Sequence, residues 1–249
     1  MKNNFKMVVS YDGTRYFGCE HQTNTDMTIQ GKIETVLTRM VGAEEMVRVI
    51  AAGRTDAGVH AEAMTCNVLL DTKMTPEEIL VYLNHYLPDD IGVLEVKLAG
   101  ERFHSRFNAT GKTYRYTCYA GVQKPIFDRK YVYVLEKKPD IAKMQQAAEV
   151  LLGTHDYKSF CGNPKMKKST VRTVDRITIE EKNNYITFTY HGDGFLQHMI
   201  RIMTGTLLEV GFGKRTPESM TELLLAENRK QAGVTAPAQG LCLVEVDYS

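Results

Sequence analysis

In the first hundred residues, the spacing of hydrophobic and polar positions alternates between the one typical of strands and the one typical of helices. This pattern predicts strands alternating with helices. Strands are expected at residues 5–11, 47–52, 61–70 and 91–98, and helices at residues 28–41 and 75–86. The first helix has Thr28 as its expected cap. The second begins with Thr75-Pro76-Glu77-Glu78, which combines a capping residue, an early proline and two acids. The predicted order is β-α-β-β-α-β.

The second half of the chain repeats this alternation with longer connections. Strands are expected at residues 112–119, 171–181, 185–190 and 241–246, and helices at residues 139–152, 195–210 and 217–226. Asn183-Asn184 separates two of these strands and is typical of a hairpin turn. The pattern predicts an α+β fold of two split β-α-β halves that share one sheet. The boundary between the halves is expected near residues 100–109.

Composition narrows the class of protein. The chain has 249 residues, of which 43% are hydrophobic and 24% are charged, as in an ordinary globular protein with a sizeable core. No apolar run approaches the roughly 18–20 residues that span a bilayer, and the first apolar run is interrupted too soon for a signal peptide. The five cysteines and seven histidines show no metal-binding or disulfide spacing. We therefore expect a cytoplasmic protein with no membrane partner and no metal.

Charge is informative only locally, because the net charge is +1. Two stretches are rich in cations, one at residues 158–176 and one at residues 102–112. The second interleaves its cations with aromatic residues. Such stretches suit a phosphate backbone and stacked bases. A solvated surface loop would have the same composition, so both interpretations stay open.

The densest group of polar residues lies between two predicted strands, in Gly53-Arg54-Thr55-Asp56-Ala57-Gly58-Val59-His60. In one interpretation this is a hairpin loop in which Asp56 caps its own turn and Arg54 is solvated. In the other, the loop presents the Asp56 carboxylate to a ligand with Arg54 beside it. The residues of the loop are compatible with both.

Residues 53–60 resemble the active-site motif of TruA-type tRNA pseudouridine synthases. Further motifs of that family follow in order along the chain. They are YDGTRYFG at residues 11–18, FHSRFNAT with KTYRY at residues 103–116, FLQHMIR at residues 195–201 and GLCL at residues 240–243. Because these motifs cover nearly the whole chain at suitable spacing, the sequence is identified as a member of this family.

The resemblance implies the pseudouridine synthase fold, in which two RRM-like or ferredoxin-like halves share a mixed, largely antiparallel central sheet with flanking helices. Residues 1–103 would form the half with the catalytic aspartate loop, and residues 104–249 the half that completes the active-site cleft. The implied activity is isomerisation of uridine to pseudouridine at positions 38, 39 and 40 of the tRNA anticodon stem-loop. The implied enzyme is a homodimer and needs no cofactor.

The resemblance also implies a role for each site residue. Asp56 would be the nucleophile, acting either at C1′ or as the activator of glycal formation, and a carboxylate suits this role because it is ionised at neutral pH without special tuning. Tyr114 would stack on the flipped base and help to remove the C5 proton, and Arg201 would pair with Asp56. Arg54 would occupy the space that the extruded base leaves. The substrate-binding residues implied are Arg54, Tyr114, Arg106, Phe195 and Lys112.

One segment departs from the family pattern. The chain has Gly18-Cys19-Glu20-His21-Gln22 where the family often has G-W-Q-x-Q, and it contains no tryptophan. The departure leaves Asp56, Tyr114 and Arg201 in place, so it concerns the RNA target rather than the chemistry. Two alternatives stay open: the same reaction on another RNA such as rRNA, and a non-catalytic RNA-binding protein with two RRM-like halves.

Overall fold

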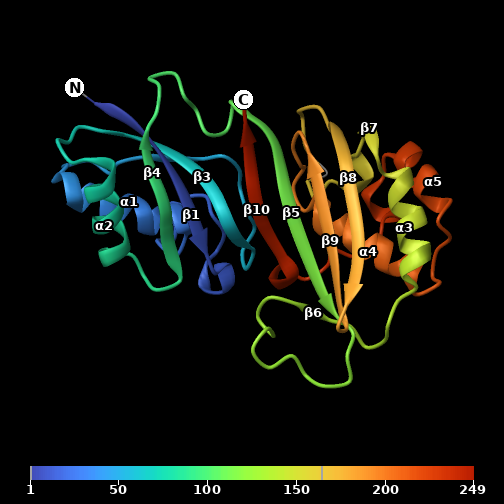
Figure 1. Ribbon diagram of the computed structural model, residues 1–249. Coiled ribbons are helices and arrows are strands. Elements are labelled where there is room, and N and C mark those ends of the chain that lie inside the picture. Colours follow the sequence, from blue (N-terminus) through green and yellow to red (C-terminus); the bar gives the residue numbers. More distant parts are fainter. Residues whose placement is uncertain (1, 164) are drawn as a thin grey trace. The chain divides into compact units, whose positions relative to one another are not determined.

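The structure is a computed structural model that describes residues 2–163 and 165–249 (Figure 1). The chain divides into two compact units. Unit 1 comprises Met1–Thr110 with Cys242–Ser249, and unit 2 comprises Gly111–Leu241. The first unit thus ends after Thr110 rather than after residue 103, and the last strand of the chain returns to it.

Hydrogen bonds explain why residues 104–110 belong to unit 1. The backbone N–H of Ser105 donates to Asn67 Oδ1 at 2.9 Å, and the Ser105 hydroxyl donates to the carbonyl oxygen of Ile50. From the C-terminal strand, the Tyr248 hydroxyl donates to the carbonyl oxygen of Ser105 at 2.6 Å. Ser105 is completely buried as a result. These partners are distant in sequence, so periodicity does not reveal them.

Unit 1 is a β-α-β-β-α-β arrangement with one added strand, as the hydrophobic pattern predicts. Its elements are β1 (Asn3–Tyr11), η1 (Gly13–Arg15), α1 (Ile29–Val41), β2 (Val49–Ala51), β3 (His60–Leu70), α2 (Pro76–Tyr86), β4 (Ile91–Leu98) and β10 (Leu241–Tyr248). Strand β1 pairs antiparallel with β3 and β4, and β2 pairs antiparallel with β3. Strand β10 pairs parallel with β3, so the sheet is mixed and largely antiparallel.

The buried side chains of unit 1 are those that the strand and helix spacing of the sequence predicts. Phe5, Met7 and Val9 alternate along β1 and are at most 1% exposed, while Ile33 and Leu37 on α1 are completely buried. Helix α2 packs against β4 and α1. Both predicted helix starts are confirmed: the Thr28 side chain caps α1, and a full capping box begins α2.

The strands of unit 2 have the order β5-β9-β8-β7, in which all three pairings are antiparallel, and β6 pairs parallel with β5. Its strands are β5 (Ala109–Tyr119), β6 (Tyr133–Val134), β7 (Gly153–Asp156), β8 (Val171–Lys182) and β9 (Tyr185–Gly192). The predicted hairpin is confirmed, since Asn183 and Asn184 have φ of 53° and 68° and join β8 to β9. The α+β class is confirmed in both units.

The helices of unit 2 are shorter than the sequence predicts. They are α3 (Ile141–Val150), α4 (Met199–Gly211) and α5 (Ser219–Ala226), with short 3-10 turns η2 (Lys158–Phe160), η3 (Arg229–Gln231) and η4 (Ala238–Gly240). The predicted start of α4 at residue 195 was wrong, because His198 has a φ of 59° and interrupts the helix. The carbonyl oxygen of Gln197 accepts instead from the N–H of Gly162 at 2.7 Å. Phe195 therefore lies in the loop before α4.

Within residues 2–163 and 165–249, no helix is long and apolar enough to cross a bilayer.

Candidate active site

The loop between β2 and β3 carries Arg54 and Asp56, and the residue between them anchors it. The Thr55 side chain is 7% exposed, and its hydroxyl lies 2.8 Å from the hydroxyl of Tyr11 at the end of β1. Arg54 is exposed and Asp56 is half-buried. The buried hydroxyl pair thus fixes the middle of the loop while a carboxylate and a guanidinium remain accessible on either side.

The YDGTRYFG segment at residues 11–18 holds the same loop by its backbone. The N–H of Cys19 donates to the carbonyl oxygen of Thr55 at 3.1 Å, and the N–H of Gly58 donates to the carbonyl oxygen of Tyr16 at 3.3 Å. The backbones approach so closely that a Cβ on Gly13 would lie 1.9 Å from the carbonyl oxygen of Val59. Only glycine fits at position 13. The Asp12-Gly13 pair therefore not only forms a turn but also supports the loop of Asp56.

Asp90, immediately before β4, anchors this supporting segment in turn. Its carboxylate accepts from Arg15 Nε at 2.7 Å and from the Tyr16 hydroxyl at 2.6 Å. Burial, with the hydrogen bond to Asp90, raises the pKa of Tyr16 to about 12. Partial burial opposes ionisation of Asp90, but the hydrogen bonds from Arg15 and Tyr16 outweigh it and hold the pKa of Asp90 below its usual value.

The segment that departs from the family pattern continues from this support. Cys19 is 1% exposed, and burial raises the pKa of its thiol to about 12. Glu20 is exposed, and its Oε2 lies 3.4 Å from Nη1 of Arg54. His21 Nδ1 lies 3.0 Å from Oε2 of the buried Glu34 on α1. Position 19 is therefore a core position, whereas position 20 contacts the loop of Asp56.

In unit 2, Tyr114 and Phe195 lie together. Tyr114 pairs with Tyr190 across β5 and β9 and is 7% exposed. The Phe195 ring packs edge-on against the Tyr114 ring, with their centroids 5.4 Å apart. Phe195 lies in a loop rather than in the predicted helix. It still contacts Tyr114, because the loop before α4 returns to β5. The Tyr114 ring is therefore buried beside Phe195, which is itself half-buried.

Arg201 lies in the first turn of α4 and is half-buried. Its Nε donates to the carbonyl oxygen of Ala236 at 2.8 Å, which fixes one edge of the guanidinium. Lys112 lies on β5, two residues before Tyr114, and Arg106 is exposed in the loop that follows β4. The predicted site residues thus form two sets: Arg54, Asp56 and Arg106 in unit 1, and Lys112, Tyr114, Phe195 and Arg201 in unit 2.

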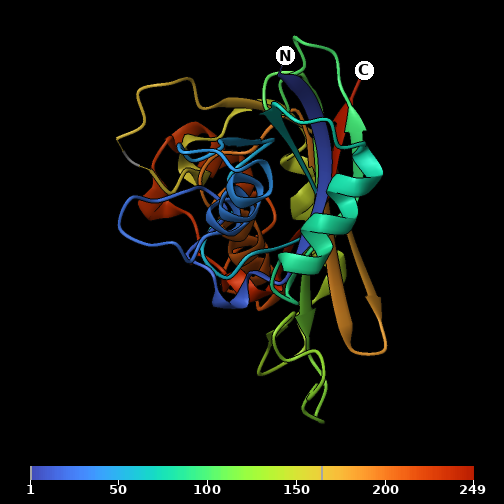
Figure 2. The same ribbon diagram turned by 90° about the vertical axis from the view of Figure 1, so that its left-hand side faces the viewer.

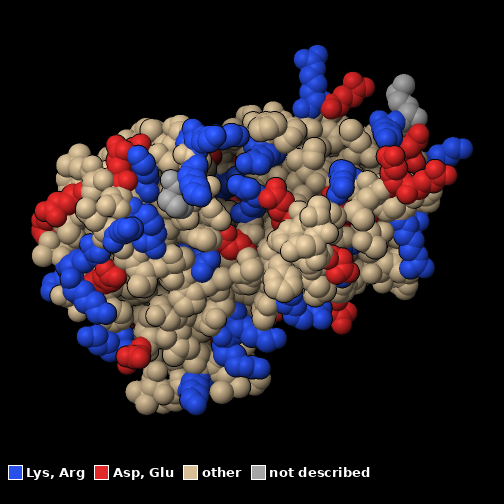
Figure 3. Space-filling model, turned by 180° about the vertical axis from the view of Figure 1, so that it is seen from behind, with Lys and Arg blue, Asp and Glu red and all other residues tan. Residues whose placement is uncertain are grey.

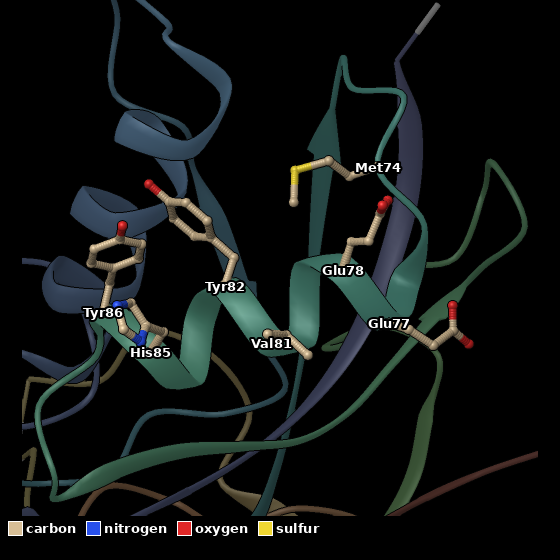
Figure 4. Close-up of a pocket in the computed structure, with 7 residues that line it drawn as sticks. All are labelled: Met74, Glu77, Glu78, Val81, Tyr82, His85 and Tyr86. Carbon is tan, nitrogen blue, oxygen red and sulfur yellow. The ribbon is translucent and has the colours of Figure 1, made fainter.

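A pocket on the outer side of α2 holds none of these residues (Figure 4). Its volume is about 490 Å³, and it is lined by Met74, Glu77, Glu78, Val81, Tyr82, His85 and Tyr86. It is not where the sequence motifs gather, so we do not assign the substrate to it. Among the residues that the structure describes, no group of three or more His, Cys, Asp or Glu side chains could hold a metal ion.

Comparison with known proteins gives consistent matches along the chain. A family model described as tRNA pseudouridine synthase matches residues 7–108 and 147–249, which include Asp56 and Arg201 but not Tyr114. The chain is 45% identical to tRNA pseudouridine synthase A of Bacillus sp. (strain KSM-64), covering 99% of this chain and 100% of the relative. It is 42% identical to the protein of that name from Clostridium kluyveri, covering 98% and 99%. It is 43% identical to tRNA pseudouridine synthase A 1 of Clostridium tetani, with the same coverage.

Proposed function

The chain belongs to the tRNA pseudouridine synthase family, and from this premise we propose that it modifies positions 38, 39 and 40 of the tRNA anticodon stem-loop. Membership makes the chain an isomerase that converts uridine in tRNA to pseudouridine. The reaction breaks the C1′–N1 bond and joins C1′ to C5, while C5 loses a proton and N1 gains one. No electrons are exchanged with a partner, so the reaction needs no redox cofactor.

The observation that carries the proposed chemistry is the loop of Asp56, which resembles the family's active-site motif and lies in a region that the family model covers. In the proposed reaction Asp56 is the nucleophile. Its loop is suited to this because Tyr11 and Thr55 fix the backbone while the carboxylate stays partly accessible. A rigid attachment matters, since a misplacement of about 1 Å can cost about 10²-fold in rate.

The other site residues are proposed to bind and position the uridine. Tyr114, with Phe195 against its ring, stacks on the extruded base and assists removal of the C5 proton. Arg201 pairs with the Asp56 carboxylate and keeps it ionised. Arg54 fills the space of the extruded base, and its exposure and length suit that task. Lys112 and Arg106 contact phosphates.

Tritium at C5 of uridine tests this proposal, because each turnover releases that atom to water. We expect release from tRNA that carries labelled uridine at position 38, 39 or 40, and none from the same tRNA with cytidine at all three positions. Release from rRNA but not tRNA would select the same chemistry on another RNA. Tight binding of tRNA without release from any RNA would select the non-catalytic alternative.

We also propose, from the family resemblance, that the enzyme acts as a homodimer in the cytoplasm. Light scattering of the purified protein is expected to give twice the mass of one chain, both alone and after tRNA is removed by high salt. A concentration-independent mass of one chain would contradict the dimer without affecting the proposed chemistry, because the tritium assay measures turnover directly.

A further inference from the structure

The segment between β5 and β6, residues 120–132, exposes an unusual amount of apolar surface. Val122 is 98% exposed, Phe127 is 90% exposed and Ile126 is 55% exposed. Figures 1 and 2 show that the segment projects beyond the ends of β8 and β9 of the same unit. It lies in the part of the chain that the family model does not match. Isolated exposed apolar residues are common, but three so close together on one projection indicate a surface that something covers.

Hydrogen bonds anchor the second half of this projection. The Tyr185 hydroxyl donates to Asp128 Oδ2 at 2.5 Å, and the N–H of Tyr131 donates to the carbonyl oxygen of Asp128 at 2.7 Å. Gln239 Nε2 donates to the carbonyl oxygen of Val132 at 3.1 Å. The backbone that follows Phe127 is thus anchored to the rest of unit 2, which reduces the entropy that a partner must overcome on binding.

The charges on the projection select the chemistry of the partner. Lys124, Arg129 and Lys130 are all exposed, and the acid among them, Asp128, accepts the Tyr185 hydroxyl. Seen from behind in Figure 3, cations stand among uncharged residues on the lowest lobe of the surface. Cations that flank an exposed aromatic ring fit a nucleic acid, whose bases stack on the ring while its phosphates meet the cations.

A second copy of the chain is a poorer occupant. If the projection lay on the two-fold axis of a symmetric dimer, it would meet itself, and its excess of cations would face an identical excess. Juxtaposition of like charges opposes such an interface, whereas a polyanion relieves the repulsion.

We propose that residues 120–132 form a second RNA contact, in which Phe127 stacks on an unpaired base and Lys124 and Lys130 meet phosphates. The proposal rests on the proposed function in taking tRNA as the RNA. Five residues of β5 lead from Tyr114 to Tyr119, where the projection begins, and at about 3.3 Å per residue they span about 16 Å. The base on Phe127 is therefore not the base that is isomerised, so this contact affects binding and not turnover.

Phe127→Ala tests the proposal through the affinity for full-length tRNA. We expect the Kd and KM to rise roughly 5- to 100-fold, as when one base–aromatic stack is removed, with kcat at saturating tRNA unchanged. Phe127→Trp is expected to restore the wild-type affinity. The matched control is Leu225→Ala, which removes an 80% exposed apolar side chain from α5 of the same unit and is expected to change neither constant.

The lysines are tested by the salt dependence of binding. Lys124→Gln with Lys130→Gln is expected to reduce the slope of log Kd against log salt by about 2, one for each phosphate that the variant no longer neutralises. An unchanged Kd in Phe127→Ala, or a fall to monomeric mass in that variant, would overturn the proposal. Binding of tRNA is measured without turnover. A wild-type protein that binds tRNA but releases no tritium would therefore contradict the proposed function and leave the proposed RNA contact in place.

Discussion

Asp56→Asn is expected to lower tritium release from tRNA by at least about 10⁴-fold, the order of effect found when a covalent catalyst is removed. Asparagine has nearly the same shape as aspartate but lacks its negative charge, so attack at C1′ or activation of glycal formation is lost. The Tyr11–Thr55 hydroxyl pair and the backbone hydrogen bonds of the loop do not involve the carboxylate. The variant is therefore expected to stay folded and to bind tRNA, with any fall in melting temperature limited to the loss of the proposed pairing with Arg201.

Glu101→Gln is the control for Asp56→Asn, because it neutralises another carboxylate of unit 1, one that is exposed and outside the loop. It is expected to keep full turnover. If Asp56→Asn retained a turnover within tenfold of the wild type, with its melting temperature intact, Asp56 could not be the nucleophile. A loss of turnover accompanied by unfolding would instead show a structural role.

Gly13→Ala is expected to lower turnover by about 10- to 100-fold and to reduce the free energy of unfolding by about 1–3 kcal/mol. The added Cβ would lie 1.9 Å from the carbonyl oxygen of Val59 and 2.7 Å from its carbonyl carbon. Both of these atoms belong to the backbone, so no side chain can rotate away to relieve the overlap. The loop of Asp56 must shift, and the distance between its carboxylate and the uridine changes.

Gly100→Ala makes the same chemical change in the same unit, at a position where a Cβ would meet no atom within 4 Å. Its turnover and melting temperature are expected to equal those of the wild type. The comparison is made by single-turnover tritium release together with thermal unfolding. Wild-type turnover in Gly13→Ala would mean that the approach of residue 13 to the loop does not position Asp56.

The elements with a clear period and a local stop signal were predicted well from the sequence. Thr28 and Thr75 begin α1 and α2 as expected, and Asn183-Asn184 forms the expected hairpin turn. The start of α4 could not be predicted, because the apolar pattern continues back through residues that a left-handed His198 removes from the helix. Strand β7 was missed since Gly153-Thr154-His155-Asp156 contains no apolar residue, and pairing with β8 alone defines it.

The candidate site was predictable only as a set of residues that resemble a family's motifs. The position of Asp56 in a glycine-containing loop was compatible with an ordinary turn. What distinguishes the loop is its support by Tyr11, Tyr16 and Gly13, which lie about forty residues earlier in the chain. Spacing within a segment carries no information on such long-range support. The same holds for Phe195, whose packing against Tyr114 depends on a loop rather than on a helix face.

Burial of Cys19 has a consequence for the durability of the enzyme. Burial raises the pKa of its thiol to about 12, so the thiol stays protonated at neutral pH, whereas the thiolate is the form that reacts with oxidants and alkylating agents. The residue that replaces the family's frequent tryptophan therefore behaves as a small apolar side chain. The hydrogen bond from the backbone N–H of Cys19 to Thr55, which supports the loop of Asp56, is therefore expected to persist under oxidising conditions.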